Sequence, residues 1–159
     1  MKVPTLYLDT SVIGGHFDAE WRDATRELFR QAGAGLYRLV TSVVTAREIL
    51  GAPPEVREHF AATFADPAQI HELTDEAELL ARAYLAAGVV PPKYADDARH
   101  VAIATVHGLG VIVSWNFHHL ANLRREAGFN AANLLQGYPQ VRIVSPLELI
   151  HENDEDETL

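Results

Sequence analysis

Hydrophobic residues along the chain fall into short continuous runs, separated by longer stretches in which they recur every three or four positions. The short runs predict strands at 4–8, 37–42, 111–113 and 141–144, with a short edge strand at 69–73. The longer stretches have the period of amphipathic helices. They predict helices over 18–32, 45–50, 55–64, 75–87, 98–106, 117–126, 130–135 and 146–150.

Strands that alternate with helices predict a mostly parallel central sheet covered by helices on both faces, because parallel strands need crossover connections. We therefore expect an α/β protein with a three-layer α/β/α fold. Capping residues set several helix ends. Thr74 is suited to begin the helix over 75–87 and Gly88 to end it, and Gly128 is expected to end the helix over 117–126.

Size and composition fit one globular domain. With 159 residues, 48% of them hydrophobic, the chain can bury a core, and we expect a single domain over 1–150 followed by an acidic, disordered tail over 151–159. The apolar runs are too short for a membrane span, and a strand follows Met1 and Lys2 where a signal peptide would have its apolar segment. Cysteine is absent, which excludes disulfides and thiolate metal sites and agrees with a cytoplasmic location.

The formal net charge of −9 argues against a broad electrostatic surface for nucleic acid. The segment 151–159 holds five of the 22 acidic residues, and without it 13 basic residues face 17 acidic ones, a net of −4. A metal site built from carboxylates would account for more of this excess, because a bound cation reverses the local sign. The charge therefore leaves a metal-dependent enzyme acting on nucleic acid open.

Three carboxylates and one amide stand near the ends of predicted strands and helices. Asp9 directly follows the first strand, Glu48 comes shortly after the second, and Asp97 opens a helix that leads to a further strand. Asn116 lies just past the end of that strand. Because ligands of open α/β sheets bind at the carboxyl ends of the strands, we expect these four residues to converge there and to be catalytic.

Oxygen donors without cysteine or a clear histidine spacing select hard cations such as Mg²⁺ or Mn²⁺. The expected metal ligands are Asp9, Glu48, Asp97 and Asn116, with Asp96 as an additional carboxylate. Such a cluster suits hydrolysis of phosphodiester bonds, because the cation lowers the pKa of a bound water and stabilises the leaving oxygen.

Four further residues are candidates for binding the substrate. Thr10 and Ser11 follow the first acidic residue, and Ser114 ends the strand before the predicted amide ligand. Arg99 lies one turn into the helix that carries two of the acids, so it is the best placed cation for a phosphate group.

The acids on helices also have a purely structural interpretation. Thr45 and Glu48 have the spacing of a capping box, which alone would explain the glutamate. Asp96 and Asp97 suit the positive end of the helix dipole. These interpretations stay open beside the catalytic one.

Asn116 could simply cap the helix predicted over 117–126. Asp9 is harder to explain as a cap, because Gly14 and Gly15 follow too soon for a good helix. The position of Asp9 therefore favours a functional role more strongly than that of any other acid.

The histidines are weaker candidates for metal binding. His118 and His119 are adjacent at an expected helix start, which is more typical of a solvated surface. His100 and His107 are seven residues apart on one helical face and suggest zinc only weakly.

Four segments carry these residues in a fixed order: LDTSVI (8–13), TAREIL (45–50), DARHVAIA (97–104) and VSWNF (113–117). Together, in this order and at these spacings, they resemble the motifs of PIN domains and in particular those of VapC-type ribonuclease toxins. The resemblance extends from Leu6 to about Ile150, nearly the whole chain.

The resemblance implies a sheet sandwiched by helices and an acidic Mg²⁺ or Mn²⁺ site that cleaves single-stranded RNA. Asp9, Glu48 and Asp97 fall on the family's acidic positions. Asn116 stands where many members carry a fourth aspartate, and Ser114 stands where they carry serine or threonine. The resemblance also implies a homodimer and a small antitoxin protein that holds the enzyme inactive.

Three functions compete on the sequence alone. The first is a metal-dependent endoribonuclease, the toxin of a type II toxin–antitoxin pair. The second is a PIN-like scaffold that binds RNA or protein without cleaving, which the amide at Asn116 and the acidic surface favour. The third is a phosphotransferase with Asp9 as nucleophile, although that chemistry usually wants a second acid two residues on, where this chain has Ser11.

Overall fold

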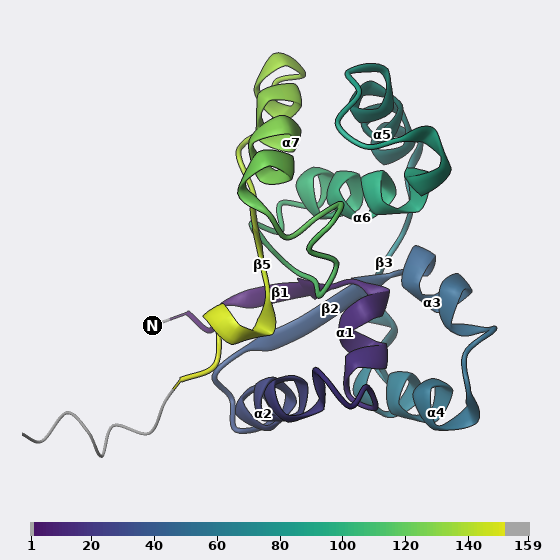
Figure 1. Cartoon of the computed structure of the whole chain (residues 1–159), viewed down its shortest axis with the longest axis vertical. Coiled ribbons are helices and arrows are strands. Elements are labelled where there is room, and N and C mark those ends of the chain that lie inside the picture. Colours follow the sequence, from purple (N-terminus) through teal and green to yellow (C-terminus); the bar gives the residue numbers. More distant parts are fainter. Residues whose placement is uncertain (1, 152–159) are drawn as a thin grey trace, which may run out of the picture.

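The computed structural model describes residues 2–151 and has a five-stranded, wholly parallel sheet with helices on both faces (Figure 1). The predicted three-layer fold is confirmed. The strand order is β3-β2-β1-β4-β5. The strands are β1 (Thr5–Leu8), β2 (Arg38–Ser42), β3 (Ile70–His71), β4 (Val111–Val113) and β5 (Arg142–Val144).

The helices fall into two groups (Figure 1). On one face of the sheet lie α1 (Thr10–Gly15), α2 (Arg22–Gly33) and α4 (Pro54–Thr63). The opposite face carries α5 (Asp75–Ala86), α6 (Ala95–Val106) and α7 (Leu123–Leu135). A short helix, α3 (Val43–Ile49), extends directly from β2, and single 3₁₀ turns occupy Pro67–Gln69, Pro92–Tyr94 and Pro146–Glu148.

The alternation of side chains along the strands divides the core in two. In β1, Leu6 and Leu8 pack with α1, α2 and α4, whereas Tyr7 between them packs with α5, α6 and α7. All three are at most 1% exposed. Burial on both faces explains why the strands read as short, continuous apolar runs in the sequence.

The strand order reverses at the centre of the sheet, next to β1. The chain adds β2 and β3 on one side of β1 and later adds β4 and β5 on the other side. The carboxyl ends of β1 and β4 therefore lie side by side at a topological switch point, which is where open α/β sheets bind ligands.

Several helices differ from the prediction: α2 begins at Arg22 and not at 18, α6 begins at Ala95 and not at 98, and the helix predicted over 146–150 is a single 3₁₀ turn. The start of α3 differs for a clear reason. Ser42 caps α3 through a hydrogen bond that its hydroxyl accepts from Val44 N at 3.2 Å, so α3 begins at Val43 and Thr45 lies inside it. The capping box that Thr45 and Glu48 could have formed is therefore absent, and the structural interpretation of Glu48 is wrong.

The two helices predicted over 117–126 and 130–135 are a single helix, α7. Its cap is Asn122, whose side chain accepts a hydrogen bond from Arg125 N, and residues 117–122 form turns before it. Gly128, expected to end a helix, lies inside α7, where a Cβ would sit 3.1 Å from Val89 Cγ1. The glycine thus serves close packing of α7 on the chain after α5.

No helix within residues 2–151 is both long and apolar enough to cross a membrane. The acidic tail predicted at the carboxyl end falls almost wholly on residues 152–159, which lie outside the described residues. At the last described position, His151 exchanges backbone hydrogen bonds with the side chain of Gln31 on α2.

Candidate active site

Asp9 is the carboxylate nearest the centre of the sheet. It directly follows β1 and caps α1, which forms a full six residues despite the glycines at its end. Its Oδ1 accepts hydrogen bonds from Ser11 Oγ at 2.6 Å and Val12 N at 3.3 Å, and its Oδ2 accepts one from Ser114 Oγ at 2.5 Å. Burial raises the pKa of Asp9, while His100 and these hydrogen bonds offset part of the effect.

Glu48 reaches the same region from α3. Its Oε1 accepts hydrogen bonds from Thr10 Oγ1 at 3.0 Å and from His100 Nε2 at 2.8 Å. Both donors come from other elements, α1 and α6. Glu48 is therefore held by tertiary contacts across the site.

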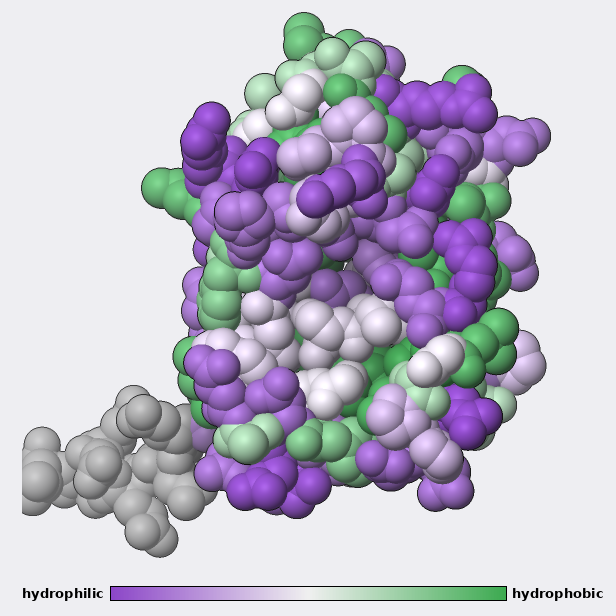
Figure 2. Space-filling model, turned by 45° about the vertical axis from the view of Figure 1, so that its right-hand side comes forward, coloured by the Kyte–Doolittle hydropathy of each residue, from purple (hydrophilic) through white to green (hydrophobic). Residues whose placement is uncertain are grey.

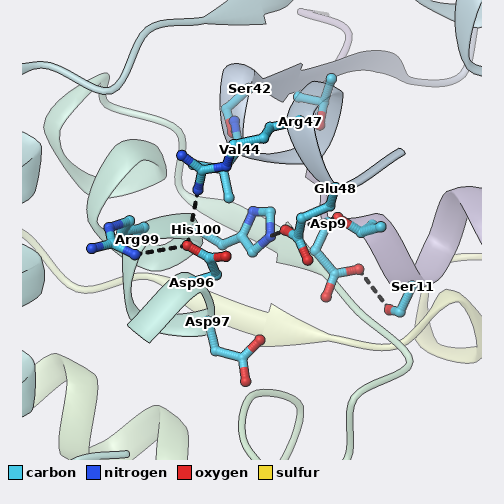
Figure 3. Close-up of polar contacts among 12 residues, drawn as sticks. Asp9, Ser11, Ser42, Val44, Arg47, Glu48, Asp96, Asp97, Arg99 and His100 are labelled. Atoms are coloured by element: carbon cyan, nitrogen blue, oxygen red, sulfur yellow. Dashed lines mark hydrogen bonds and ion pairs between the residues drawn. The ribbon is translucent and has the colours of Figure 1, made fainter. Parts of the chain in front are cut away.

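Asp97 occupies the first turn of α6 and points towards the space shared by Asp9 and Glu48 (Figure 3). The pKa of Asp97 is raised to about 6, chiefly by burial and also by the charges of Asp9 and Glu48, against the attraction of His100. The three acids therefore influence one another electrostatically although they come from three different elements. Figure 2 turns the side with α3 and α6 forward and shows a narrow hollow near the middle of that face, beneath hydrophilic residues.

Asn116 joins this group through its nitrogen. Its Nδ2 lies 3.4 Å from Asp97 Oδ2, and its Oδ1 accepts a hydrogen bond from His119 N at 3.0 Å. A backbone N–H can only donate, so this contact fixes which side of the amide faces the carboxylate. In this arrangement Asn116 donates to Asp97, and its oxygen caps the turn after β4.

Asp96, expected as an additional ligand, lies apart from the other acids. Its Oδ1 is 2.8 Å from Arg99 Nη1 and 3.1 Å from Arg47 Nη2 (Figure 3). The guanidinium of Arg99 is also held by both oxygens of Glu78. Asp96 therefore does not supply the charge that Asn116 lacks, and Arg99, proposed to bind phosphate, is already engaged by two carboxylates.

The three hydroxyl residues expected to bind substrate instead hold the acids. Thr10 donates to Glu48, and Ser11 and Ser114 both donate to Asp9. Ser11 Oγ also accepts from the backbone N–H of Trp115, and Ser114 is 0% exposed. Their hydroxyl hydrogens are directed at carboxylates, so these side chains orient the acids, and their binding of substrate stays a prediction.

His100 is the residue of this region that the sequence analysis did not place. It lies on α6 one turn after Asp97, is only 2% exposed, and contacts both Tyr7 and Glu48. Burial lowers the pKa of His100, but the hydrogen bond to Glu48 and the charges of the three acids outweigh that effect and raise it. Its supposed zinc partner, His107, instead contacts the carbonyl oxygen of Glu72.

Among residues 2–151, no three His, Asp or Glu side chains already stand in an arrangement that could hold a metal ion. The chemistry of the donors nonetheless fits a hard divalent cation, since three carboxylates are neighbours and the pKa values of Asp9 and Asp97 are raised. Raised pKa values mean that negative charge at this point is poorly compensated. A cation would compensate it once the carboxylates drew together.

Solved structures that share this fold include the following two. The crystal structure of FitAcB from Neisseria gonorrhoeae has a TM-score of 0.57 and 16% sequence identity, and the match covers 89% of this chain and 98% of that one. The structure of FitAB bound to an IR36 DNA fragment has a TM-score of 0.54 and 17% identity, with 93% and 99% covered. No family model and no curated protein matches the chain. The fold is PIN-like, as the sequence motifs imply.

Proposed function

We propose that this protein is a metal-dependent endoribonuclease that cleaves single-stranded RNA by hydrolysis. The observation that carries the proposal is the approach of Asp9, Glu48 and Asp97, from β1, α3 and α6, at the carboxyl edge of the sheet (Figure 3). Their mutual repulsion is costly in a buried place, so a purely structural role accounts for them poorly. A role in holding a cation accounts for all three.

In this proposal each side chain has a defined task. Asp9, Glu48 and Asp97 hold Mg²⁺ or Mn²⁺, which when bound supplies an acidic water and stabilises the charge on the leaving oxygen. Ser11 and Ser114 keep Asp9 in place through hydrogen bonds. Thr10 does the same for Glu48, and Asn116 for Asp97.

The proposal includes partners that follow from the resemblance to VapC-type toxins. An antitoxin protein would hold the enzyme inactive in the cytoplasm, and two copies would form a homodimer. Exposed leucines on α7, with Leu134 at 58% and Leu135 at 86%, give an apolar surface available for such contacts.

The test is cleavage of a mixed pool of single-stranded RNA with Mg²⁺ or Mn²⁺. We expect Asp9→Asn, Glu48→Gln and Asp97→Asn to lower the rate by more than about 100-fold, since even changes to groups behind metal ligands approach that loss. Asp96→Asn is the matched control, because Asp96 forms ion pairs with two arginines and lies apart from the other acids. This variant should cleave RNA as fast as the parent.

DNA of the same length and sequence belongs in the same experiment, because one of the structures that share the fold has a DNA fragment bound. Cleavage of DNA in preference to RNA would contradict the proposed substrate. Equal rates for the parent and the Asp9→Asn variant would contradict the proposed site.

A second function keeps support from a specific observation, the contact between Asn116 and Asp97. An amide hydrogen directed at Asp97 provides some of the stabilisation that a cation would otherwise supply, as a PIN-like scaffold without cleavage would require. Calorimetric titration with Mn²⁺ separates the two, since a scaffold would bind RNA without binding the cation. The phosphotransferase has no such support, because Asp9 is 3% exposed and both its oxygens accept hydrogen bonds.

A further inference from the structure

A continuous chain of hydrogen bonds runs from the interior of the protein to Glu48. His100 Nε2 lies 2.8 Å from Glu48 Oε1, and His100 Nδ1 lies 2.7 Å from the hydroxyl of Tyr7. That hydroxyl in turn lies 2.7 Å from Ser42 Oγ. The four side chains come from α3, α6, β1 and β2, so the chain joins two strands and two helices of the fold.

The direction of the contact with Glu48 follows from simple chemistry. An ionised carboxylate only accepts hydrogen bonds, so His100 Nε2 carries the hydrogen. The neutral Nε2–H form and the imidazolium both satisfy this condition. The contact therefore exists whichever of the two forms the ring takes.

The supports of His100 are rigid. The imidazole is 2% exposed, and the rings of His100 and Tyr7 pack edge to face at 5.8 Å between centroids. Tyr7 is 0% exposed at the centre of the sheet, and Ser42 is fixed as the cap of α3. Nothing in this series of contacts depends on solvent or on an exposed loop.

Glu48 needs such support more than its partners do. Its side chain has three rotatable bonds and is 34% exposed, and its other hydrogen-bond donor, Thr10, lies near the surface. Asp9, by contrast, is shorter, buried and held by three donors. A long carboxylate at the rim of a site loses its position unless something buried holds it.

We propose that His100 is a positioning residue that holds the carboxylate of Glu48 in place for the cation, with Tyr7 and Ser42 fixing the ring from behind. This inference rests on the proposed function, since it assigns His100 a role toward the same site. In this role His100 supports a metal ligand, and the three acids remain the ligands themselves. Groups that orient metal ligands in this way change metal affinity by about 10–100-fold when removed.

Two substitutions at one position distinguish positioning from mere packing. In His100→Gln the amide nitrogen falls close to the place of Nε2 and can still donate to Glu48. In His100→Asn the nitrogen falls close to the place of Nδ1 and cannot reach Glu48. Both remove the ring and both disturb the core, so their losses of thermal stability should be similar.

The measurement is the affinity for Mn²⁺ by calorimetry, with circular dichroism and thermal melts on each variant. We expect His100→Asn to weaken Mn²⁺ binding by about 10–100-fold and His100→Gln to retain most of it. His107→Gln is the control at the end of the same helix, because His107 contacts the carbonyl oxygen of Glu72 and the ring of His71, and it should leave affinity unchanged.

A second measurement needs neither metal nor activity. Proton–nitrogen NMR of the metal-free protein should show a slowly exchanging Nε2–H proton on His100, and Glu48→Ala should abolish it. Tyr7→Phe should keep this proton but speed its exchange, because the ring then lacks its partner at Nδ1. This measurement tests the hydrogen bond between His100 and Glu48 even where a variant at His100 fails to fold, and the absence of such a proton in the parent would overturn the inference.

The outcomes separate the inference from the function on which it rests. If the parent binds Mn²⁺ and His100→Asn binds it equally well, the inference is overturned and the nuclease proposal stands. Equal weakening in both His100 variants would show that the ring only packs, which also overturns it. If the parent neither binds Mn²⁺ nor cleaves RNA, the proposed function fails and the positioning role fails with it.

Discussion

Asp97→Asn should stabilise the metal-free protein at neutral and alkaline pH. In the folded protein the pKa of Asp97 is raised from 3.8 to about 6, first by burial and then by the charges of Asp9 and Glu48. The folded state therefore holds a proton more tightly than the unfolded chain does between these two values. Stability from this group is greatest at low pH and is lost as the pH rises from about 4 to about 6.

The size of the effect follows from the same shift. A pKa difference of one corresponds to 1.36 kcal/mol, so the rise from 3.8 to about 6 sets an upper limit of about 3 kcal/mol. Asp97 is only partly buried, and solvent screening reduces this to about 1–2 kcal/mol. For a chain of this length that gain raises the melting temperature by about 2–8 °C.

The assay is a set of thermal or urea melts of the parent and Asp97→Asn between pH 4 and pH 8, with a chelator present. Asparagine cannot ionise, so the gain should be full at pH 8 and close to zero at pH 4. Asp96→Asn, which loses partly exposed ion pairs, should show no gain at any pH. A gain for Asp97→Asn that did not depend on pH, or a loss at pH 8, would refute the account of clustered, poorly compensated acids.

Three further predictions concern other parts of the molecule. An amide at Asn116 adds no negative charge that could help to hold a second cation, so Asn116→Asp should tighten binding of a second Mn²⁺ in calorimetry and raise cleavage at low metal concentration. Asn116→Ala should cost about 1 kcal/mol by removing the cap of the following turn. Gly15→Ala should lower stability by about 1–3 kcal/mol in urea melts, because its Cβ would lie 2.8 Å from an indole ring, while Gly14→Ala, with open space around it, should not. Light scattering at micromolar concentration should give the mass of a dimer, and a monomer mass for the parent would count against the apolar surface around Leu135 as an interface.

The strands were predictable because a strand that is buried on both faces has a short, continuous run of apolar residues. Val111–Val113 and Arg142–Val144 lie where the apolar runs placed them, and the parallel arrangement follows from their alternation with helices. Helix ends were less predictable because tertiary contacts override local rules. Gly128 resembles a helix end in sequence, but its missing side chain makes room for Val89.

The approach of the acids was predictable from strand ends and neighbouring helix starts, but the hydrogen-bond partners of each acid were not. Asp96 and Asp97 are adjacent and chemically alike, yet one faces two arginines and the other faces the site. Successive side chains of a helix point about 100° apart, so the packing of α6 in the fold decides which of the two faces the site. A signal for His100 was nevertheless present, because a histidine in an Ala-rich, buried helix one turn after an acid must find hydrogen-bond partners inside the protein.

The dipoles of the helices favour two of the three acids and disfavour the third. Asp9 caps the start of α1 and Asp97 lies in the first turn of α6, so both stand at the positive end of a helix. Glu48 lies in the last turn of α3, at the negative end, where its own helix disfavours a carboxylate. The hydrogen bond from His100 is directed at this acid and offsets the unfavourable field at the one position where the backbone does not. Two of the three carboxylates therefore stand at favourable helix starts, and the third, at an unfavourable helix end, accepts a hydrogen bond from a buried ring.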